Sequence, residues 1–383
     1  MASNYDIIVI GAGAMGSAAA YHAAKAGQRV LLLEQFEIDH QKGSSHGASR
    51  IIRYVYDHPA YVALAHAAYD AWRALEAEAG EELYVRTGGI NFAPPGNAEF
   101  AQTVRTLQTA GIPFDLLTPD ELHQRFPQFR LPQRMEALYQ ADTGLLAASR
   151  CVRAHVRLAR AHGAEVVQNA PVTGITATAS GVEVRAGGAT YSAGKLILVP
   201  GAWINLLLQG LGMQLPLRVV KTQEIYFRAA DMAAYQPDRF PAFIGHLADE
   251  YGYSTYGIAS YNDSGVKIGL HGGETFDPTT PERAPDESAI ERSFAFAQKY
   301  LPEGGWTFLS ARACLYTYTP DEHFIIDQHP EYPHVVIASV CSGHGFKFSA
   351  VIGEILSDLA TSGQTRRDIG LFRMSRFESV LLR

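Results

Sequence analysis

Cysteine, long apolar runs and clustered basic charge are all scarce in this chain of 383 residues. Its three cysteines, Cys151, Cys314 and Cys341, lie far apart and form no CxxC pair. That excludes a disulfide framework and a structural zinc site, and it is typical of a reducing compartment. No apolar run reaches the roughly 18 residues of a membrane helix, and the first run is too short for a signal peptide. The net charge of −7, without a basic block, argues against a nucleic-acid partner. We expect a cytoplasmic protein with no membrane, nucleic-acid or metal partner.

The overall composition is typical of a globular protein. Hydrophobic residues make up 47% of the chain and charged residues 19%. A chain of 383 residues is too long for one ordinary core. The sequence therefore predicts two domains, which the order of the elements interleaves.

The clearest motif runs from Tyr5 to Glu34. A β-branched run leads into GAGAMG, an Ala-rich helix follows, and a second apolar run ends at the acid. Gly11 permits a tight turn, Gly13 lets the backbone approach a pyrophosphate, and Gly16 lets the helix sit close to the sheet. Glu34 is placed to accept hydrogen bonds from an adenosine ribose. The pattern predicts a dinucleotide site and leaves NAD and FAD both open.

The rest of the chain alternates between helical and strand patterns. Helical periodicity covers residues 60–78, 97–109, 149–162 and 282–300, and Thr118 with Glu121 predicts a capped helix start. Residues 218–228, 250–256, 265–271 and 306–315 are predicted as strands of an antiparallel sheet. We expect a discontinuous nucleotide domain at 1–85, 145–215 and 315–383, and a second domain at 86–144 and 216–314.

Several isolated residues have an ordinary interpretation and a functional one. In a helical turn Arg50 and Arg53 would share one face, although such a pair is more often solvated. In the strand at 265–271, Lys267 and His271 share a face about 13 Å apart, and Gly269 between them is expected to leave open space. A surface position is the ordinary interpretation of both, and a buried hydrophobe is that of Cys314.

Five segments occur in order over nearly the whole chain: GAGAMG, GSSHGASRIIR, GVKIGLH, ARACLYTYTPDEHFIIDQHP and SGHGFKFSAVIGEIL. Together they resemble the monomeric sarcosine oxidase and N-methyltryptophan oxidase family of FAD amine oxidases. The resemblance implies a fold of mixed α/β and α+β class, in which a Rossmann-like FAD domain is interleaved with a substrate domain on a mostly antiparallel sheet. It also implies a monomer whose FAD is attached by a thioether to Cys314.

The resemblance gives the remaining residues their roles. Lys267 matches the lysine that speeds the reaction with dioxygen, where a fixed cation stabilises charge developing on oxygen. Arg53 and Lys347 match the pair that binds the substrate carboxylate. Cys341 is expected to be a packing residue. The expected site residues are catalytic Lys267, Arg50, His271 and Tyr256; substrate-binding Arg53, Lys347 and Tyr316; and cofactor-binding Gly11, Gly13, Met15, Gly16, Glu34, Ser44, His46, Gly47, Arg50, Val172, Gly201, Trp203, Cys314, Gly343, His344, Gly345, Phe346 and Lys347.

The chain departs from the family pattern in two places. The family often reads GSHHGDTR, where this chain has Ser45 and Ala48 in place of the first histidine and the aspartate. The loop after Arg53, YVYDHPAY, is one residue shorter than the usual form, and it forms part of the pocket wall in relatives. Substrate choice is therefore least safely carried over at this loop.

The sequence predicts a flavoprotein oxidase of secondary N-methyl amino acids, with sarcosine as the first choice. The neutral amine gives up a hydride equivalent, water hydrolyses the imine to formaldehyde and the primary amino acid, and dioxygen becomes hydrogen peroxide. No general base is assigned. N-methyl-L-tryptophan, proline and pipecolate are alternative substrates. An NAD-dependent dehydrogenase and a non-catalytic flavin-binding protein are the alternative classes.

Overall fold

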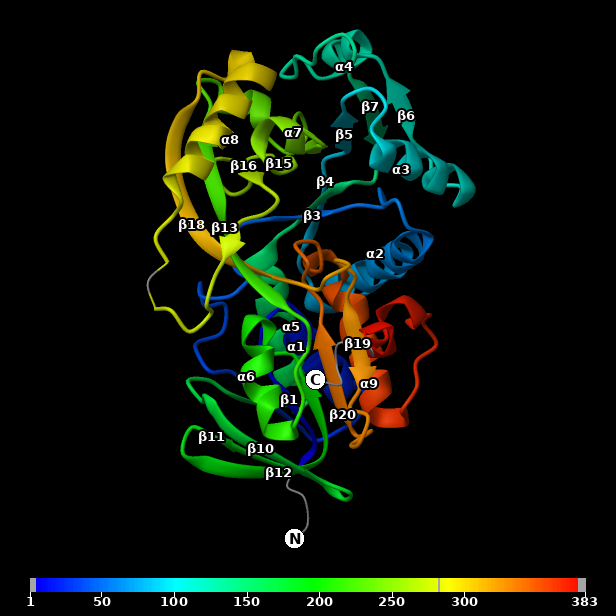
Figure 1. Ribbon diagram of the computed structural model, residues 1–383, viewed down its shortest axis with the longest axis vertical. Coiled ribbons are helices and arrows are strands. Elements are labelled where there is room, and N and C mark those ends of the chain that lie inside the picture. Colours follow the sequence, from blue (N-terminus) through cyan, green and yellow to red (C-terminus); the bar gives the residue numbers. More distant parts are fainter. Residues whose placement is uncertain (1–4, 282, 378–383) are drawn as a thin grey trace.

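The computed structural model describes residues 5–281 and 283–377 (Figure 1). The lower half in Figure 1 is built on an eight-stranded sheet whose central strands are parallel: β1 pairs with β2 and β12, β2 with β9, and β12 with β20. An antiparallel β10–β11–β12 meander extends it, and β19 pairs with β20. The strands are β1 (Tyr5–Ile10), β2 (Val30–Leu33), β9 (Glu165–Val167), β10 (Val172–Thr178), β11 (Gly181–Ala186), β12 (Ala189–Leu198), β19 (Ile325–Gln328) and β20 (Val335–Ser339).

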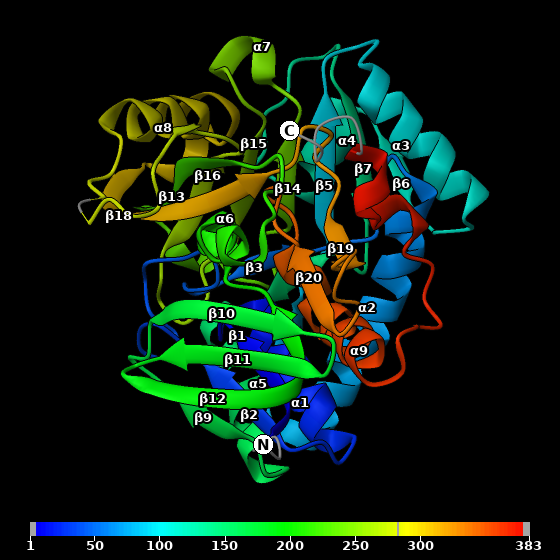
Figure 2. The ribbon, with the colours of Figure 1, turned by 60° about the horizontal axis from the view of Figure 1, so that its bottom comes forward.

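Helices cover both faces of this sheet. On one face α1 (Ala14–Lys25) contacts α5 (Ala148–Ala161) and α9 (Ser349–Ser362), and α9 contacts α2 (Pro59–Ala79). Helices α1 and α9 pack so closely that a Cβ at Gly353 would lie 2.5 Å from the backbone of Ala18, and the glycine is what allows this approach. Figure 2 shows α6 (Ile204–Leu208) and the β10–β11–β12 meander on the near side of the sheet. The parallel sheet is thus buried on both sides, as its near-continuous apolar strands require.

A second sheet of nine strands occupies the upper half of Figure 1. Its pairs are antiparallel except β5 with β14. The strands are β5 (Gly89–Ala93), β6 (Asp115–Leu117), β7 (Glu136–Gln140), β13 (Arg218–Arg228), β14 (Ala242–Gly245), β15 (Thr255–Ile258), β16 (Val266–Leu270), β17 (Glu274–Thr275) and β18 (Thr307–Tyr318). The helices on it are α3 (Ala98–Thr109), α4 (Pro119–Arg125), α7 (Ala248–Tyr251) and α8 (Glu287–Tyr300).

A small three-stranded sheet, with the order β3–β8–β4, joins the two halves: β3 (Arg50–Ile52), β4 (Tyr84–Arg86) and β8 (Gly144–Leu146). The mixed fold class predicted from the sequence is confirmed. The proposed domain boundaries stay a prediction, although the nine-stranded sheet draws its strands from residues 89–140 and 218–318. In the described part of the chain, no helix combines the length and the apolar character that a bilayer crossing demands.

Some local predictions hold and others are wrong. Thr118 caps α4 in a complete capping box with Glu121, as predicted. Residues 250–256 are not one strand, because α7 ends at Gly252 in the left-handed conformation and β15 begins only at Thr255. The helix expected at 282–300 begins at Glu287, where Asp286 accepts from the first amides; residue 282 lies outside the described part. Residues 50–53 form no helical turn, since Arg50 begins strand β3.

Candidate active site

A cavity of about 690 Å³ runs from the glycine turn after β1 to the second sheet, within the 300–1,000 Å³ usual for ligand sites. Most of the expected site residues line it: Gly11, Gly13, Met15, Glu34, Ser44, Arg50, Arg53, Val172, Gly201, Trp203, Tyr256, Lys267, His271, Cys314, Tyr316, Gly343, His344, Gly345, Phe346 and Lys347. Gly16, His46 and Gly47 are not part of the lining. Residues from both ends of the chain therefore meet at one site.

The glycine turn has the conformation that its residues predict. Gly11 has φ +98°, and a Cβ there would lie 2.6 Å from the carbonyl oxygen of Val199. A Cβ at Gly16 would lie 1.7 Å from the carbonyl oxygen of Gly11, so Gly16 serves the close approach of α1 and not the cavity wall. No side chain caps α1 at Gly13. The helix N-terminus therefore offers N–H groups and positive dipole to an anion.

Glu34 stands at the end of β2 as predicted. It lines the cavity and is almost fully buried. Its Oε2 accepts from the Ala12 N–H at 2.8 Å, and its Oε1 accepts from the Phe36 N–H at 2.9 Å. Burial raises the pKa of Glu34 despite these bonds. Each oxygen retains acceptor capacity for a ribose hydroxyl.

The polar groups of the cavity fit a dinucleotide such as FAD. The side chain of Ser49 is fully buried beside it, and its Oγ has no hydrogen-bond partner among the described residues. Ser45, which sequence reasoning treated only as a departure, accepts the Ala14 N–H at 2.9 Å and ties the following loop to the glycine turn. A long cavity with a helix N-terminus at one end, a buried acid and spare hydrogen-bonding groups matches a dinucleotide. Within residues 5–281 and 283–377, no cluster of histidine, cysteine and acidic side chains is arranged to hold a metal ion.

Two thiols line the cavity. Cys314 and Tyr316 lie on one face of β18 and both reach it. Burial raises the pKa of Cys314 to about 11, while Arg50, with Nη2 3.9 Å from the sulfur, opposes the rise. Cys341 also lines the cavity and its sulfur accepts the Thr317 N–H at 3.4 Å. Cys341 therefore faces the cavity as well as packing against β18, and its expected role as a packing residue stays a prediction.

Strand β16 alternates as predicted. Lys267 and His271 line the cavity, whereas Val266, Ile268 and Leu270 pack in the core of the second sheet. Gly269 leaves no open space, because a Cβ there would lie 3.0 Å from the ring of Tyr256. The glycine instead makes room for the tyrosine.

The Lys267 ammonium is buried and has two fixed acceptors. Its Nζ donates to the Ser49 carbonyl at 2.7 Å and to Oε1 of Glu224 at 2.7 Å. One N–H of the ammonium therefore stays available to a ligand in the cavity that Lys267 lines. Burial lowers the pKa of Lys267, and Glu224 opposes that change.

Glu224 lies among the expected site residues, although the sequence reasoning did not name it. It lies in β13, is 3% exposed and lines the cavity. Besides Lys267, it accepts from Arg50 through the same oxygen. The available signal was an acid in the middle of the strand predicted at residues 218–228. A position facing the interior would have required a partner, because a buried acid is almost always paired.

Arg53 and Lys347 form a second cationic pair. Both line the cavity near the Tyr56 ring, with the Arg53 guanidinium carbon 4.2 Å and the Lys347 Nζ 5.4 Å from its centroid. Lys347 donates to the Tyr56 hydroxyl at 2.8 Å and to the His344 carbonyl at 2.6 Å. In the described part of the chain, neither cation has a carboxylate within 4 Å. The arrangement gives this end of the cavity the character of an anion-binding wall.

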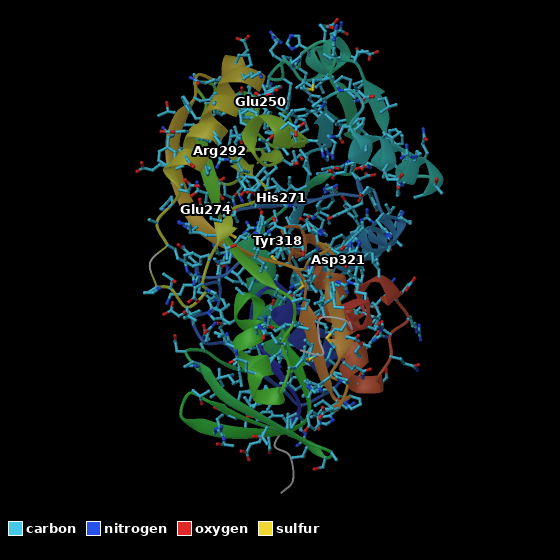
Figure 3. All side chains as sticks on the ribbon, viewed as in Figure 1. Glu250, His271, Glu274, Arg292, Tyr318 and Asp321 are labelled. Atoms are coloured by element: carbon cyan, nitrogen blue, oxygen red, sulfur yellow. The ribbon has the colours of Figure 1, made fainter. Side chains whose placement is uncertain are left out.

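His271 and Tyr316 form the wall beside that cationic pair. Their rings lie 5.4 Å apart, and a Cβ at Gly343 would lie 2.5 Å from the imidazole. Burial, followed by Lys347 and Arg53, lowers the pKa of His271 to about 4. Figure 3 shows His271 near the middle of the molecule, where its upper and lower halves meet. The imidazole is therefore neutral at physiological pH.

Known proteins agree with this geometry. The family described as FAD dependent oxidoreductase matches residues 6–359. The chain is 37% identical over 385 residues to the monomeric sarcosine oxidase of Bacillus sp. (strain B-0618), covering 98% of this chain and 97% of that one. It is 35% identical over 379 residues to the N-methyl-L-tryptophan oxidase of Salmonella arizonae, covering 97% and 99%.

A solved structure of NikD, an unusual amino acid oxidase essential for nikkomycin biosynthesis, superimposes with a TM-score of 0.86 at 25% identity and covers 96% of this chain and 97% of that one. These matches decide between the two dinucleotides that the glycine motif left open, because the matching family uses FAD. The chain belongs to the family of FAD dependent oxidoreductases that contains the monomeric sarcosine oxidases and N-methyl-L-tryptophan oxidases.

Proposed function

We propose that this protein oxidatively demethylates a secondary N-methyl amino acid, with sarcosine as the first-choice substrate. The observation that carries the proposal is the unneutralised pair of Arg53 and Lys347 in the FAD cavity. Lys347 is buried and Arg53 is partly buried, and neither has a carboxylate within 4 Å in the described part of the chain, so both favour an anionic ligand. An amino acid carboxylate meets that need, and it places the adjacent amine toward the middle of the cavity.

Bound FAD would accept two electrons from the substrate C–N unit and pass them to dioxygen, giving hydrogen peroxide. The protein binds and orients the substrate. Arg53 offers paired N–H donors to the carboxylate and Lys347 offers a point charge. Burial, and then Arg53, lower the pKa of Lys347 well below its usual range. A bound carboxylate would favour the ammonium form of Lys347 again.

The walls of the site favour a small substrate. The Tyr256 ring fills the space at Gly269, and His271 and Tyr316 pack against Gly343. We assign no general base, because a substrate that binds as the neutral amine needs none. Because His271 is neutral, we treat it as a residue of the pocket wall and not as a charged group that takes part in the reaction.

Four further proposals accompany this function. FAD is attached through a thioether to Cys314, the protein is a monomer, it acts in the cytoplasm, and its FAD and substrate domains follow the boundaries proposed from the sequence. The position of Cys314 in the cavity lining supports the first.

A panel of amines tests the substrate. Purified enzyme is mixed with sarcosine, N-methyl-L-tryptophan, L-proline, L-pipecolate or glycine, and peroxide release is measured. We expect the highest kcat/KM with sarcosine. Peroxide from a cyclic amino acid or N-methyl-L-tryptophan at higher kcat/KM would replace sarcosine, and no peroxide from any amine would contradict the oxidase.

Arg53→Ala tests the carboxylate site. Loss of a bidentate charged partner costs about 2–4 kcal/mol, so we expect KM to rise roughly 30-fold or more. Arg73→Ala is the matched control, because Arg73 lies on the exposed face of α2 and pairs only with Asp70 in the described part. An unchanged KM in Arg53→Ala would exclude the proposed carboxylate contact.

A further inference from the structure

A charge cluster beside Lys267 is held together by one carboxylate. Oε1 of Glu224 accepts from both Lys267, at 2.7 Å, and Arg50. Its Oε2 lies 3.7 Å from Nδ1 of His46. Glu224, Lys267 and His46 are 3%, 1% and 1% exposed, so water screens these charges little.

The backbone leaves space for this carboxylate. Gly47 has φ +104°, and a Cβ there would lie 2.4 Å from Oε2 of Glu224. The loop and strand at residues 40–56 carry His46, Arg50 and Arg53 but no acidic residue. The counter-charge must come from another element, and β13 supplies it.

We propose that Glu224 is a positioning residue that keeps Lys267 protonated and fixed at the cavity wall, so that Lys267 serves the reaction with dioxygen over a wide pH range. This inference rests on the oxidase function proposed above and on the role in the reaction with dioxygen that the family resemblance implies for Lys267. It does not depend on which amine is oxidised. Glu224 acts through Lys267 and is not assigned a contact with the substrate.

Among the described residues around Lys267, Glu224 is the group that carries a negative charge near neutral pH. The neighbouring titratable groups are His46 and Arg50 from residues 40–52, Tyr226 from β13, Tyr256 from β15, and Arg312 and Cys314 from β18. Burial lowers the pKa of His46 to about 4 and raises those of Tyr256 and Cys314 to about 12 and 11. Burial also raises the pKa of Tyr226. Near neutral pH these groups are uncharged, and the arginines are cations.

The sign of the effect of Glu224 follows from its own charge. Burial raises the pKa of Glu224, but Arg50, Lys267 and His46 together outweigh burial and lower that pKa to about 2. The carboxylate is therefore ionised throughout the working range. Burial and Arg50 lower the pKa of Lys267, and Glu224→Gln removes the largest influence that opposes them. Lys267 then loses its proton at a lower pH than in the wild type.

The test measures the dioxygen reaction alone. FAD in the holoenzyme is reduced anaerobically by light and then mixed with dioxygen from pH 6.5 to 9.5 in a stopped-flow instrument. We expect the wild-type rate to vary within about twofold up to pH 9. In Glu224→Gln it should fall about tenfold per pH unit above the lowered pKa, because the charged fraction of Lys267 falls by that factor.

Three variants serve as references. Glu224→Asp keeps the charge and should restore much of the flat profile. Lys267→Met should be slow at every pH, without the steep decline. Glu274→Gln is the matched control, because Glu274 is an exposed acid on β17, the strand that pairs with β13 (Figure 3). It should behave as wild type.

The midpoint potential of bound FAD gives a readout that does not depend on turnover. Loss of one negative charge should raise the potential of Glu224→Gln at pH 6.5, while Lys267 is still charged. The offset from wild type should shrink as pH rises and Lys267 becomes neutral. An offset that is constant with pH would overturn the proposal, since Glu224 would then act as a simple charge.

Two other results overturn the proposal. One is a Glu224→Gln rate as flat with pH as the wild type. The other is a wild-type rate that falls more than about tenfold between pH 6.5 and 9; it needs no variant and so covers a Glu224→Gln protein that fails to fold. Because light reduces FAD without any amine, failure of the amine panel leaves this test intact.

Discussion

At the scale of single residues, charge balance distinguishes the two cationic pairs of the cavity. Arg50 and Lys267 share the carboxylate of Glu224, whereas Arg53 and Lys347 have no carboxylate within 4 Å in the described part of the chain. The neutralised pair has a fixed place in the wall. The unneutralised pair is free to bind a ligand anion. The two roles proposed for these pairs rest on this difference in their partners.

The two cavity thiols permit a sharp test of flavin attachment. We expect Cys314→Ser to release its FAD on acid precipitation, and Cys341→Ser to retain it. The thioether requires a sulfur, and the Arg50 guanidinium near Cys314 favours the thiolate form that reacts. Absorbance of the supernatant and the mass of the intact protein measure the outcome. Retention in Cys314→Ser together with release from Cys341→Ser would place the bond on the other cysteine.

At the scale of elements, the α1–α9 contact sets the distance between the two ends of the cavity. Helix α1 begins at the glycine turn, and α9 follows the segment that carries Lys347. Gly353 allows these helices to meet, because a Cβ there would lie 2.5 Å from Ala18. The packing of two helices thus positions the proposed anion site relative to the dinucleotide site.

Gly353→Ala should test this contact. Overpacking a tight interface costs about 1–3 kcal/mol, so we expect the free energy of unfolding in urea to fall by that amount and KM to rise. The matched control is Gly194→Ala in β12, where the nearest heavy atom to a new Cβ is the Asp6 carbonyl oxygen at 3.5 Å. That change should stay within about 0.5 kcal/mol of wild type. Equal stability of the two variants would contradict the proposed role of the helix contact.

At the scale of the whole molecule, one cavity is lined by residues from the first strand, both sheets and the 3-10 turn Phe346–Phe348 that precedes α9. Figures 1 and 2 show the parallel sheet and its helices below the second sheet, with the chain crossing between them several times. A ligand that spans such a cavity binds the folded chain and not the unfolded one. Its binding should therefore stabilise the entire fold.

Removal of FAD should lower the thermal stability of the protein. In Cys314→Ser, from which FAD can be extracted, we expect the Tm of the apoprotein to rise with added FAD. At a free FAD concentration 100 times Kd the gain is about 2.7 kcal/mol. Circular dichroism during heating measures it, and addition of NAD is the control. A Tm that does not respond to FAD would contradict the assignment of the cavity.

The sequence by itself determined the features that depend on neighbours along the chain. The glycine turn with Glu34, the capping box at Thr118, and the alternation of β16 that sends Lys267 and His271 to one face are local patterns, and each was predicted. The five motif segments added the family, the cofactor and most of the cavity lining. Local patterns suffice here because turns, caps and strand faces depend on residues a few positions apart.

Only the tertiary structure decided the partners of these residues. Glu224 meets Arg50 across 174 positions and Lys267 across 43, and Cys341 reaches the cavity wall beside β18. Arg50 begins a strand because it pairs with β8, about a hundred residues away, and not because of its own neighbours. Charge balance in a buried site depends on distances through space. For that reason the four cations could be named from the sequence, whereas their partners could not. Only the fold shows that Glu224 neutralises Arg50 and Lys267, and that Arg53 and Lys347 have no carboxylate within 4 Å in the described part of the chain.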